Sequence, residues 1–443
     1  AHLLAVAGLH LGLVMGCVIV TLRLLMAVCP PVALRWPCRE IAVIAGFGAG
    51  CVYVLLTGCH LPAMRALGMA AFATVALLAG RRVLSMRALA LVALGIMVFA
   101  PYVVLDVSFQ MSFAAVMALI AAYDALRDWL LKLRGEGGIV RSVVSHGMAL
   151  LLTSVVAGLA TLPVSLAHFG LLQPWFVLAN LLAVPLAAVW IMPAGIAALL
   201  LMPLHLAALP VHVMGAGIAL VMLLAHVVAG FPAAETPVPA MPGAGLLLYM
   251  VGLCVLCLWR GKARLLGLLP VVVAMATPWL VTRPDVLVAP DAGSMAVRVA
   301  EGLAMGGGSG LDRFVVRDWS QALALPSVEL SDVAACDGSF CRALTSGGMV
   351  LLRPLDRSDG EDLPSAALCR DATLFVTQSP ARGACPGVPF IDRFSVWRDG
   401  AFAAYAGPHG WQIVSDRAWR GDRLWVPEPG SRGVPNLPMA QAE

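Results

Sequence analysis

A few polar side chains lie in segments that are otherwise apolar enough to sit in lipid. Ionisable and amide side chains are costly inside a bilayer, so they mark either a path for polar solutes or a structural hydrogen bond. Histidine adds acid–base chemistry near neutral pH, and a carboxylate within reach of it could support general base catalysis. The candidates for lining or gating a path are His10, Asp106, Gln110, His168 and Asn180.

Asp106 and Gln110 are one helical turn apart in the segment LDVSFQMSFAAV, so a helix places them on one face. Ser108 and Ser112 repeat this spacing beside them. Aspartate is also a favoured helix N-cap, and capping alone is an alternative explanation for Asp106. Gln110 and Ser112 lie deeper in the segment, where they require hydrogen-bond partners.

His168 lies in an uncharged turn, and Asn180 lies in the apolar segment that follows it. Pro185 and Pro193 predict a kink or a break in that segment, which membrane helices tolerate only where neighbours or a cavity satisfy the freed backbone groups. An unwound helix beside Asn180 would line a passage for a polar solute. The alternative is an asparagine that hydrogen-bonds two helices together.

The first sixteen residues, AHLLAVAGLHLGLVMG, contain glycines at four-residue intervals: Gly8, Gly12 and Gly16. On a helix these form one stripe, a small-xxx-small pattern that predicts close packing against another helix. His10 falls roughly opposite the middle of the stripe, and His2 falls to one side of it. An interfacial or hydrogen-bonded structural role explains each histidine equally well.

The elements that must position these residues are membrane helices. The chain has 443 residues, of which 60% are hydrophobic and 12% charged, and this composition indicates a polytopic membrane protein. Ten apolar runs approach or exceed the roughly 20 residues that cross a bilayer. They cover residues 3–22, 40–58, 62–79, 86–101, 107–126, 143–166, 175–200, 204–229, 243–259 and 264–281.

The positions of lysine and arginine predict the orientation of these spans. Basic residues follow the first, third, fifth and ninth spans, whereas the loops after the second, fourth, sixth and eighth contain none. Under the positive-inside rule the odd-numbered loops are cytoplasmic, which places the region after residue 282 outside the cytoplasm. The basic residues are Arg23, Arg35, Arg39, Arg81, Arg82, Arg87, Arg127, Lys132, Arg134, Arg141, Arg260, Lys262 and Arg264.

The composition changes after residue 282. Residues 1–282 contain 14 Lys and Arg against 6 Asp and Glu, a net charge of +8, and residues 283–443 contain 15 against 19, a net charge of −4. Short β-like runs bounded by Gly, Pro and Asp follow, namely VLVAPD, MAVRVA, RFVVRDW, MVLLRPL, TLFVTQ and FSVWRDG. We expect an all-α polytopic membrane bundle of about ten transmembrane helices, then a small β-rich α/β extracytoplasmic domain over residues 283–430. The last stretch, residues 431–443, reads as a disordered tail.

Four cysteines fall in the second region, and an even number in an externally placed domain suggests disulfides. Of the three possible pairings we favour the two that are local in sequence. The rival is a zinc site built from all four, which ranks lower because no paired C-x-x-C spacing is present. The preferred pairs are Cys336–Cys341 and Cys369–Cys385.

Several catalytic motifs are absent from the sequence. It contains no Walker A motif and no G-x-S-x-G nucleophile elbow. The region after residue 282 has a single histidine, His409, so a hydrolytic zinc site with several histidine ligands cannot be assembled there. We therefore expect no enzymatic activity, no metal and no cofactor.

Several segments, in order, resemble the ComEC family of bacterial competence proteins. HLLAVAGLH resembles the family signature H-L-L-A-x-S-G-L-H, with Ala7 where serine is usual. GCHLPAMRALGMA resembles a P-x-x-R-A-x-x-M segment, and DVSFQMSFAAV resembles D-x-G-F-Q-L-S-F with Ser108 in place of glycine. LPVSLAHFG and ANLLAVPL resemble later spans, so that the resemblance covers about residues 1–282.

The resemblance implies further features. An OB-like DNA-binding domain normally precedes the channel in this family; its absence here suggests a chain whose true start lies upstream. A metallo-β-lactamase-like domain with an H-x-H-x-D-H zinc motif often follows the channel and acts as a nuclease. Residues 283–430 occupy that place without the motif, so we expect a degenerate, metal-free periplasmic counterpart.

The function that the resemblance implies is an inner-membrane channel that admits single-stranded DNA during natural transformation. The implied partners are the strand in transit, membrane lipid, a competence DNA receptor, a cytoplasmic ATPase or helicase, and a second copy of the chain. One alternative is a small-solute or lipid-intermediate transporter on the same scaffold. Another is a membrane-embedded hydrolase that uses His2 and His10 with Asp106, which would require hydrogen-bond reach between them.

Overall fold

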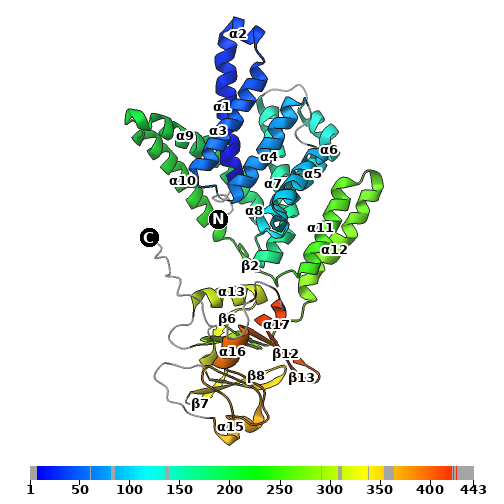
Figure 1. Ribbon diagram of the computed structural model, residues 1–443, viewed down its shortest axis with the longest axis vertical. Coiled ribbons are helices and arrows are strands. Elements are labelled where there is room, and N and C mark those ends of the chain that lie inside the picture. Colours follow the sequence, from blue (N-terminus) through cyan, green and yellow to red (C-terminus); the bar gives the residue numbers. More distant parts are fainter. Residues whose placement is uncertain are drawn as a thin grey trace. The chain divides into compact units, whose positions relative to one another are not determined.

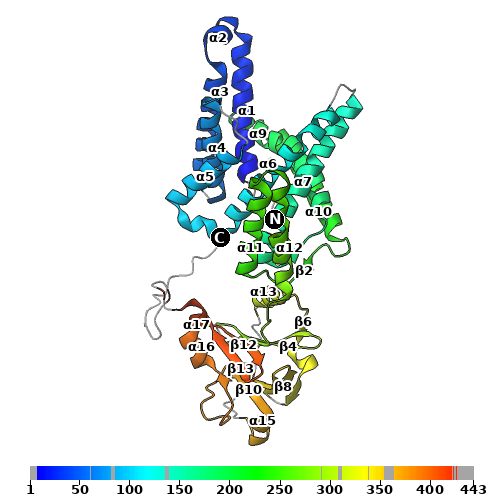
Figure 2. The same ribbon diagram turned by 90° about the vertical axis from the view of Figure 1, so that its right-hand side faces the viewer.

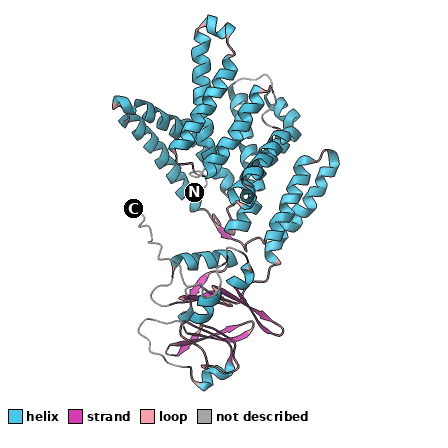
Figure 3. Cartoon of the chain, in the orientation of Figure 1, coloured by secondary structure: helices cyan, strands magenta, loops and turns pink. Residues whose placement is uncertain are grey.

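The computed structural model describes residues 7–59, 61–80, 85–134, 139–290, 292–307, 312–337, 339–353, 364–421, 423 and 426. The chain divides into two compact units (Figure 1). The helical unit comprises Ala1–Thr236 and Met241–Pro278, and the β-rich unit comprises Pro237–Ala240 and Trp279–Glu443. Figure 3 shows that strands dominate only the second of these units.

The helical unit is built from apolar helices. Within the described residues, seven are long and apolar enough to cross a membrane, and three shorter apolar helices of 10–17 residues accompany them. The α-helices are α1 (Ala7–Val28), α2 (Pro30–Arg35), α3 (Cys38–Leu56), α4 (Leu61–Leu78), α5 (Met86–Phe99), α6 (Val107–Arg134), α7 (Ile139–Phe169), α8 (Phe176–Pro185), α9 (Met192–Leu201), α10 (Ala208–Ala229), α11 (Gly243–Leu258) and α12 (Leu268–Ala276). Shorter elements are η1 (Pro101–Leu105), η2 (Leu186–Ile191), η3 (Met202–Leu204), η4 (Gly261–Gly267), η5 (Thr277–Trp279), β1 (Leu171–Leu172) and β2 (Thr236–Pro237).

Three helices, α1, α6 and α7, extend several residues past the spans predicted from apolarity. α1 continues to Val28 and α6 to Arg134, so Arg23 and Arg127 lie on helices rather than in loops. The reason is that arginine, lysine and leucine are good helix formers, so hydrogen bonding continues beyond the apolar run until a breaker is reached.

The sequence predicted a kink or a break at the prolines; the structure shows no unwound break, but a π-helical segment interrupts the α-helix between them. Pro185 ends α8, Pro193 lies in the first turn of α9, and the π-helical segment η2 separates the two. Backbone dihedrals are helical where the elements meet, with φ −60° and ψ −41° at Pro185 and φ −67° and ψ −46° at Met192. A π-helical turn redistributes the hydrogen bonds that proline cannot make, so the helix passes the prolines without unwinding. Asn180 therefore lies in a regular α-helical turn.

α1 and α3 pack side by side (Figure 2). Their contact does not involve the glycine stripe of α1. A Cβ at Gly12 or Gly16 would meet nothing within 4 Å, and at Gly8 only Ala66 at 4.0 Å. Within the described residues, the contact between α1 and α3 therefore does not use this stripe, and its role as a packing seam stays a prediction. The small residues of the contact lie on the other helix: a Cβ at Gly46 would fall 2.5 Å from Ile19 Cγ1.

α6 and α7 form an antiparallel pair that α11 joins. Tyr123 Oη lies 2.9 Å from Thr153 Oγ1 between the first two helices. The buried hydroxyl of Tyr249 on α11 donates to the Ala160 carbonyl at 2.8 Å. Ala114 of α6 packs with Tyr249 of α11 and Ala274 of α12 in one buried cluster, and the Tyr249 hydrogen bond joins α7 to it.

The β-rich unit contains two mixed sheets. Six strands run in the order β13-β12-β3-β4-β5-β6, and five in the order β11-β10-β9-β8-β7. The strands are β3 (Val286–Val288), β4 (Ser294–Val299), β5 (Gly302–Gly307), β6 (Ser327–Glu329), β7 (Ala335–Asp337), β8 (Phe340–Thr345), β9 (Gly348–Arg353), β10 (Ala372–Thr377), β11 (Phe390–Ile391), β12 (Phe402–Gly407) and β13 (Gly410–Ser415). The helices are α13 (Arg313–Leu323), α14 (Leu330–Val333), α15 (Ala366–Asp371), α16 (Arg393–Asp399) and α17 (Asp416–Arg420).

Alternate side chains of each strand face different cores. Val286 and Val297 of the larger sheet pack with Leu352 and Leu374 of the smaller one, which forms the core between the sheets. The opposite face of the larger sheet packs against α13 through Leu323. The opposite face of the smaller sheet carries a separate cluster that includes the side of α15.

Two of the predicted β-like runs are helices. RFVVRDW lies in α13 and FSVWRDG in α16, whereas VLVAPD, MAVRVA, MVLLRPL and TLFVTQ contain strand residues. The side chain of Asp312 accepts from Phe314 N, and that of Asp392 accepts from Ser395 N. These N-caps start both helices in spite of their β-branched residues.

The four cysteines of the β-rich unit form two disulfides, Cys336–Cys341 and Cys369–Cys385. This is the pairing favoured from the sequence. Cys336 and Cys341 are direct cross-strand partners of β7 and β8. Cys385 is buried in the cluster that covers the smaller sheet, and Cys369 packs against it.

Candidate polar path at the ends of α6 and α7

Asp106 caps α6. Its Oδ1 accepts hydrogen bonds from the backbone N–H groups of Ser108 at 2.8 Å and Phe109 at 3.2 Å. These donors belong to the first turn of the helix and have no partner within it. The carboxylate is thus aimed at the positive end of the helix dipole, which offsets part of its charge.

Gln110 joins the beginning of α6 to the end of α7. Its Nε2 donates to the Val104 carbonyl at 3.1 Å, and its Oε1 lies 3.1 Å from His168 Nε2. Because the amide oxygen can only accept, His168 carries a proton on Nε2 in this contact. Sequence reasoning selected both residues but gave no sign that they meet, because they are 58 positions apart.

The remaining candidates lie on other helices. His10 is half-buried on α1, next to the buried Leu11, and Asn180 is half-buried on α8. The side chain of Asn180 forms no hydrogen bond with another described residue. His2 lies outside the described residues. The predicted set is therefore brought together only in part, with Asp106, Gln110 and His168 forming the assembled portion.

This assembled portion presents side-chain groups of the kind that hydrogen-bond polar solutes. Gln110 and His168 offer hydrogen-bonding groups without net charge in the neutral histidine form, and the Asp106 Oδ1 is engaged by its own helix. Among the residues that the structure describes, no group of three or more His, Cys, Asp or Glu could hold a metal ion.

Sequence reasoning missed the small residues that matter for packing. Gly46 and Gly50 of α3 are buried, and a Cβ at Gly50 would lie 3.0 Å from Met15 Cγ and 3.1 Å from Leu11 Cδ1. The signal was available as a second four-residue glycine spacing in AGFGAGC.

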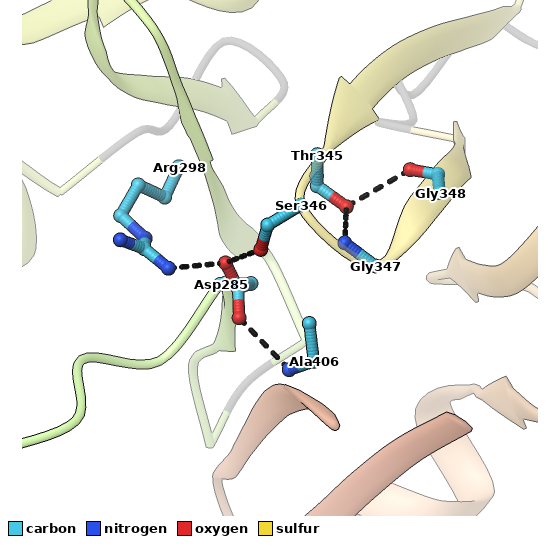
Figure 4. A network of polar contacts seen from close by, with 7 residues as sticks. All are labelled: Asp285, Arg298, Thr345, Ser346, Gly347, Gly348 and Ala406. Atoms are coloured by element: carbon cyan, nitrogen blue, oxygen red, sulfur yellow. Dashed lines mark hydrogen bonds and ion pairs between the residues drawn. The ribbon is translucent and has the colours of Figure 1, made fainter. Parts of the chain in front are cut away.

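A buried carboxylate with three hydrogen-bond donors lies in the β-rich unit (Figure 4). Asp285 is 3% exposed; its Oδ1 accepts from Arg298 and from Ser346 Oγ at 2.7 Å. Its Oδ2 accepts from Ala406 N at 2.8 Å. Burial alone would raise the pKa of Asp285, but the hydrogen bonds from Ala406, Ser346 and Arg298 outweigh it and lower the pKa. Ser346 lies in the β8–β9 turn, so this carboxylate fastens one sheet to the other.

The apolar helices and their polar contacts define a multi-pass membrane protein. The particular family follows from comparison: the competence protein family model matches residues 1–263, and the chain belongs to this family.

Two curated relatives match part of the chain. ComE operon protein 3 of Bacillus subtilis (strain 168) is 30% identical over 204 residues, which is 46% of this chain and 23% of that protein. The uncharacterized protein YcaI of Escherichia coli (strain K12) is 30% identical over 219 residues, 48% of this chain and 26% of that protein. The matched part thus spans about a quarter of the length of each relative. No solved structure matches the chain.

Proposed function

We propose that this protein is a bacterial inner-membrane channel through which single-stranded DNA enters during natural transformation. The observation that carries the proposal is the family match over residues 1–263, which includes α6, α7 and the Gln110–His168 contact. The similarity to ComE operon protein 3 supports the same role.

The proposed topology has ten membrane spans, with the β-rich unit in the periplasm. Seven long apolar helices and three shorter ones among the described residues support that number. Apart from Arg65 near the start of α4, Lys and Arg residues of the helical unit lie in or beside alternate joints, which supports the orientation. The two disulfides of the β-rich unit support an oxidising compartment.

The proposed path is lined or gated by His10, Asp106, Gln110, His168 and Asn180. A strand in transit needs a wet channel with sequence-independent polar contacts rather than base readout. Amide and imidazole groups can hydrogen-bond phosphate oxygens. The capping geometry of Asp106 directs its Oδ1 to backbone donors, which lessens its repulsion of the passing phosphates.

The proposal assigns no catalytic step to this chain. The energy for passage comes from a cytoplasmic ATPase or helicase, and a competence DNA receptor delivers the strand on the outer side. Membrane lipid surrounds the helices, and a second copy of the chain completes a homo-oligomer.

Uptake of fluorescent DNA in a deletion strain complemented with the gene tests the proposal. Gln110→Leu and His168→Leu each remove one side of the contact between α6 and α7. If that contact contributes about 1.4 kcal/mol to the passage step, uptake slows roughly tenfold. The matched control is Ser108→Ala, because this exposed side chain lies on the same turn as Asp106.

Membrane levels of each variant must equal those of the wild type. Normal transformation by both leucine variants would contradict the lining assignment. A deletion strain that still takes up DNA at the wild-type rate would contradict the channel itself and favour a transporter of small solutes or lipid intermediates.

A further inference from the structure

Two short helices of the β-rich unit carry large aromatic side chains in water. Phe394 and Trp397 of α16 are 53% and 73% exposed, and Trp419 of α17 is 82% exposed. Arginines alternate with them. We name this surface the aromatic–arginine face; it consists of Arg393, Phe394, Trp397, Arg398, Trp419 and Arg420.

On α16, the residues of the face lie on the side of the helix that points away from the core. Arg393 and Trp397 are four residues apart, as are Phe394 and Arg398, so all four lie on one side of the helix. Val396 on the other side is buried in the core between the sheets. Asp392 caps the helix and also accepts from Ala381 N at 3.1 Å.

α17 lies directly beside the end of α16. Asp416 N donates to the Ala401 carbonyl at 2.8 Å. A Cβ at Gly400 would lie 3.0 Å from Asp416 Cβ, and Gly400 has a φ of +80° that favours glycine. This close contact places the two helices, each with exposed aromatic side chains, next to each other.

The three arginines of the face differ in their partners. Arg398 bonds Asp399, and Arg420 bonds Asp416 at 2.8 Å, both at the surface. Arg393 Cζ lies 5.0 Å above the ring of Phe394, and no described carboxylate forms an ion pair with it. The face therefore offers positive charge beside exposed rings.

The β-rich unit is joined to the last candidate membrane helix by a short connection, which keeps the unit near a bilayer surface. The last candidate membrane helix covers Gly261–Trp279, and β3 begins at Val286. The six residues between them span about 20 Å at most when fully extended. Trp279 and Leu280 at the start of this connection are 62% and 76% exposed.

We propose that the aromatic–arginine face docks on the phospholipid headgroup layer. Tryptophan and phenylalanine insert readily at the boundary between headgroups and acyl chains, and arginine pairs with lipid phosphates. The short connection holds the unit at high effective concentration near lipid, so a modest intrinsic affinity suffices. This inference does not depend on DNA passage.

Photo-crosslinking of the full chain tests it. A photoreactive phenylalanine derivative replaces Trp397 or Trp419, and the protein is reconstituted in vesicles of phosphatidylethanolamine and phosphatidylglycerol. We expect lipid adducts at one or both positions, several-fold above the yield at Leu344. Leu344 is the matched control because it is 70% exposed but lies on β8.

Illumination is repeated with labelled single-stranded DNA present. Lipid adducts no more abundant than at Leu344 would overturn the inference. Adducts to DNA in place of lipid, or to the chain's own residues in place of lipid, would overturn it as well. Retention of both disulfides in the substituted proteins shows that the unit is folded.

Discussion

Asp285 shows how a single buried carboxylate contributes to the stability of the β-rich unit. Its hydrogen bonds from Arg298, Ser346 and Ala406 stabilise the ionised form. Asp392 is a second buried carboxylate with a lowered pKa; burial opposes the shift, and hydrogen bonds from Ser395 and Ala381 outweigh it. Both residues make the folded unit sensitive to acid.

Acid should destabilise the β-rich unit through these two groups. Because folding lowers the pKa of Asp285 below its ordinary value of 3.8, its stabilisation is complete above that value. It is lost as the pH falls through the lowered pKa. Asp285→Asn should reduce the free energy of unfolding at pH 7 by about 3 kcal/mol and flatten the acid dependence. Thermal unfolding of the purified chain, followed by tryptophan fluorescence from pH 7 to pH 3, measures both effects.

Asp399→Asn is the control for that measurement, because the Arg398–Asp399 pair lies at the surface and contributes little. Equal unfolding midpoints for Asp285→Asn and the wild type at pH 7 would contradict the assigned role.

At the residue scale, the sequence predicted the capping option for Asp106 and the need of Gln110 for a partner. It could not predict that the partner is His168, since that contact depends on how α6 and α7 pair. The roles of His10 and Asn180 in a path stay predictions.

At the scale of elements, the contact between α1 and α3 shows which of two similar glycine patterns is used for packing. Gly46 and Gly50 face the side chains of α1, whereas Gly12 and Gly16 face open space. A four-residue glycine spacing indicates that one side of a helix allows close packing. Which of two such stripes is used depends on where the partner helix lies.

Alanine substitutions should distinguish the two stripes. Gly46→Ala places a Cβ 2.5 Å from Ile19 Cγ1 and 3.1 Å from the Met15 carbonyl, so we expect a loss of about 1–3 kcal/mol. Gly12→Ala meets nothing and should be neutral, or more stable by up to about 1 kcal/mol because alanine favours helix. Thermal unfolding in detergent measures the difference; a Gly12→Ala protein less stable than Gly46→Ala would assign the seam to α1.

The elements of the β-rich unit show where local pattern fails. RFVVRDW and FSVWRDG have alternation and β-branched residues, yet both fold as helices that follow a capping aspartate, Asp312 or Asp392. MVLLRPL and TLFVTQ were predicted correctly because they supply β9 and β10, two mostly buried strands inside the smaller sheet. For short amphipathic segments such as RFVVRDW and FSVWRDG, tertiary packing decides between helix and strand.

On the scale of the whole molecule, the chain joins two units suited to different solvents. Composition alone separated them near residue 282, and the structure divides them at Pro278 and Trp279. Hydropathy predicted most helices, while their ends shifted because helix formation continues beyond the apolar run. The count of ten spans stays a prediction.

Cysteine labelling should report the compartment of the β-rich unit. For protein isolated from cells and denatured without reduction, we expect seven thiols to react with a mass tag, matching the seven free cysteines. Reduction should expose all 11. The Cys336→Ser/Cys341→Ser variant should lose two of the reduction-dependent tags. Eleven tags without reduction would place the unit in a reducing compartment and contradict the periplasmic topology.

The position of Asp285 has a mechanical consequence. It directly precedes β3, which has three residues, and follows the connection from the last membrane helix. Any pull transmitted along that connection therefore loads Asp285 before it loads the strand. Its bonds to Arg298, Ser346 and Ala406 spread the load over both sheets, so the strand is sheared as part of a block rather than peeled away residue by residue.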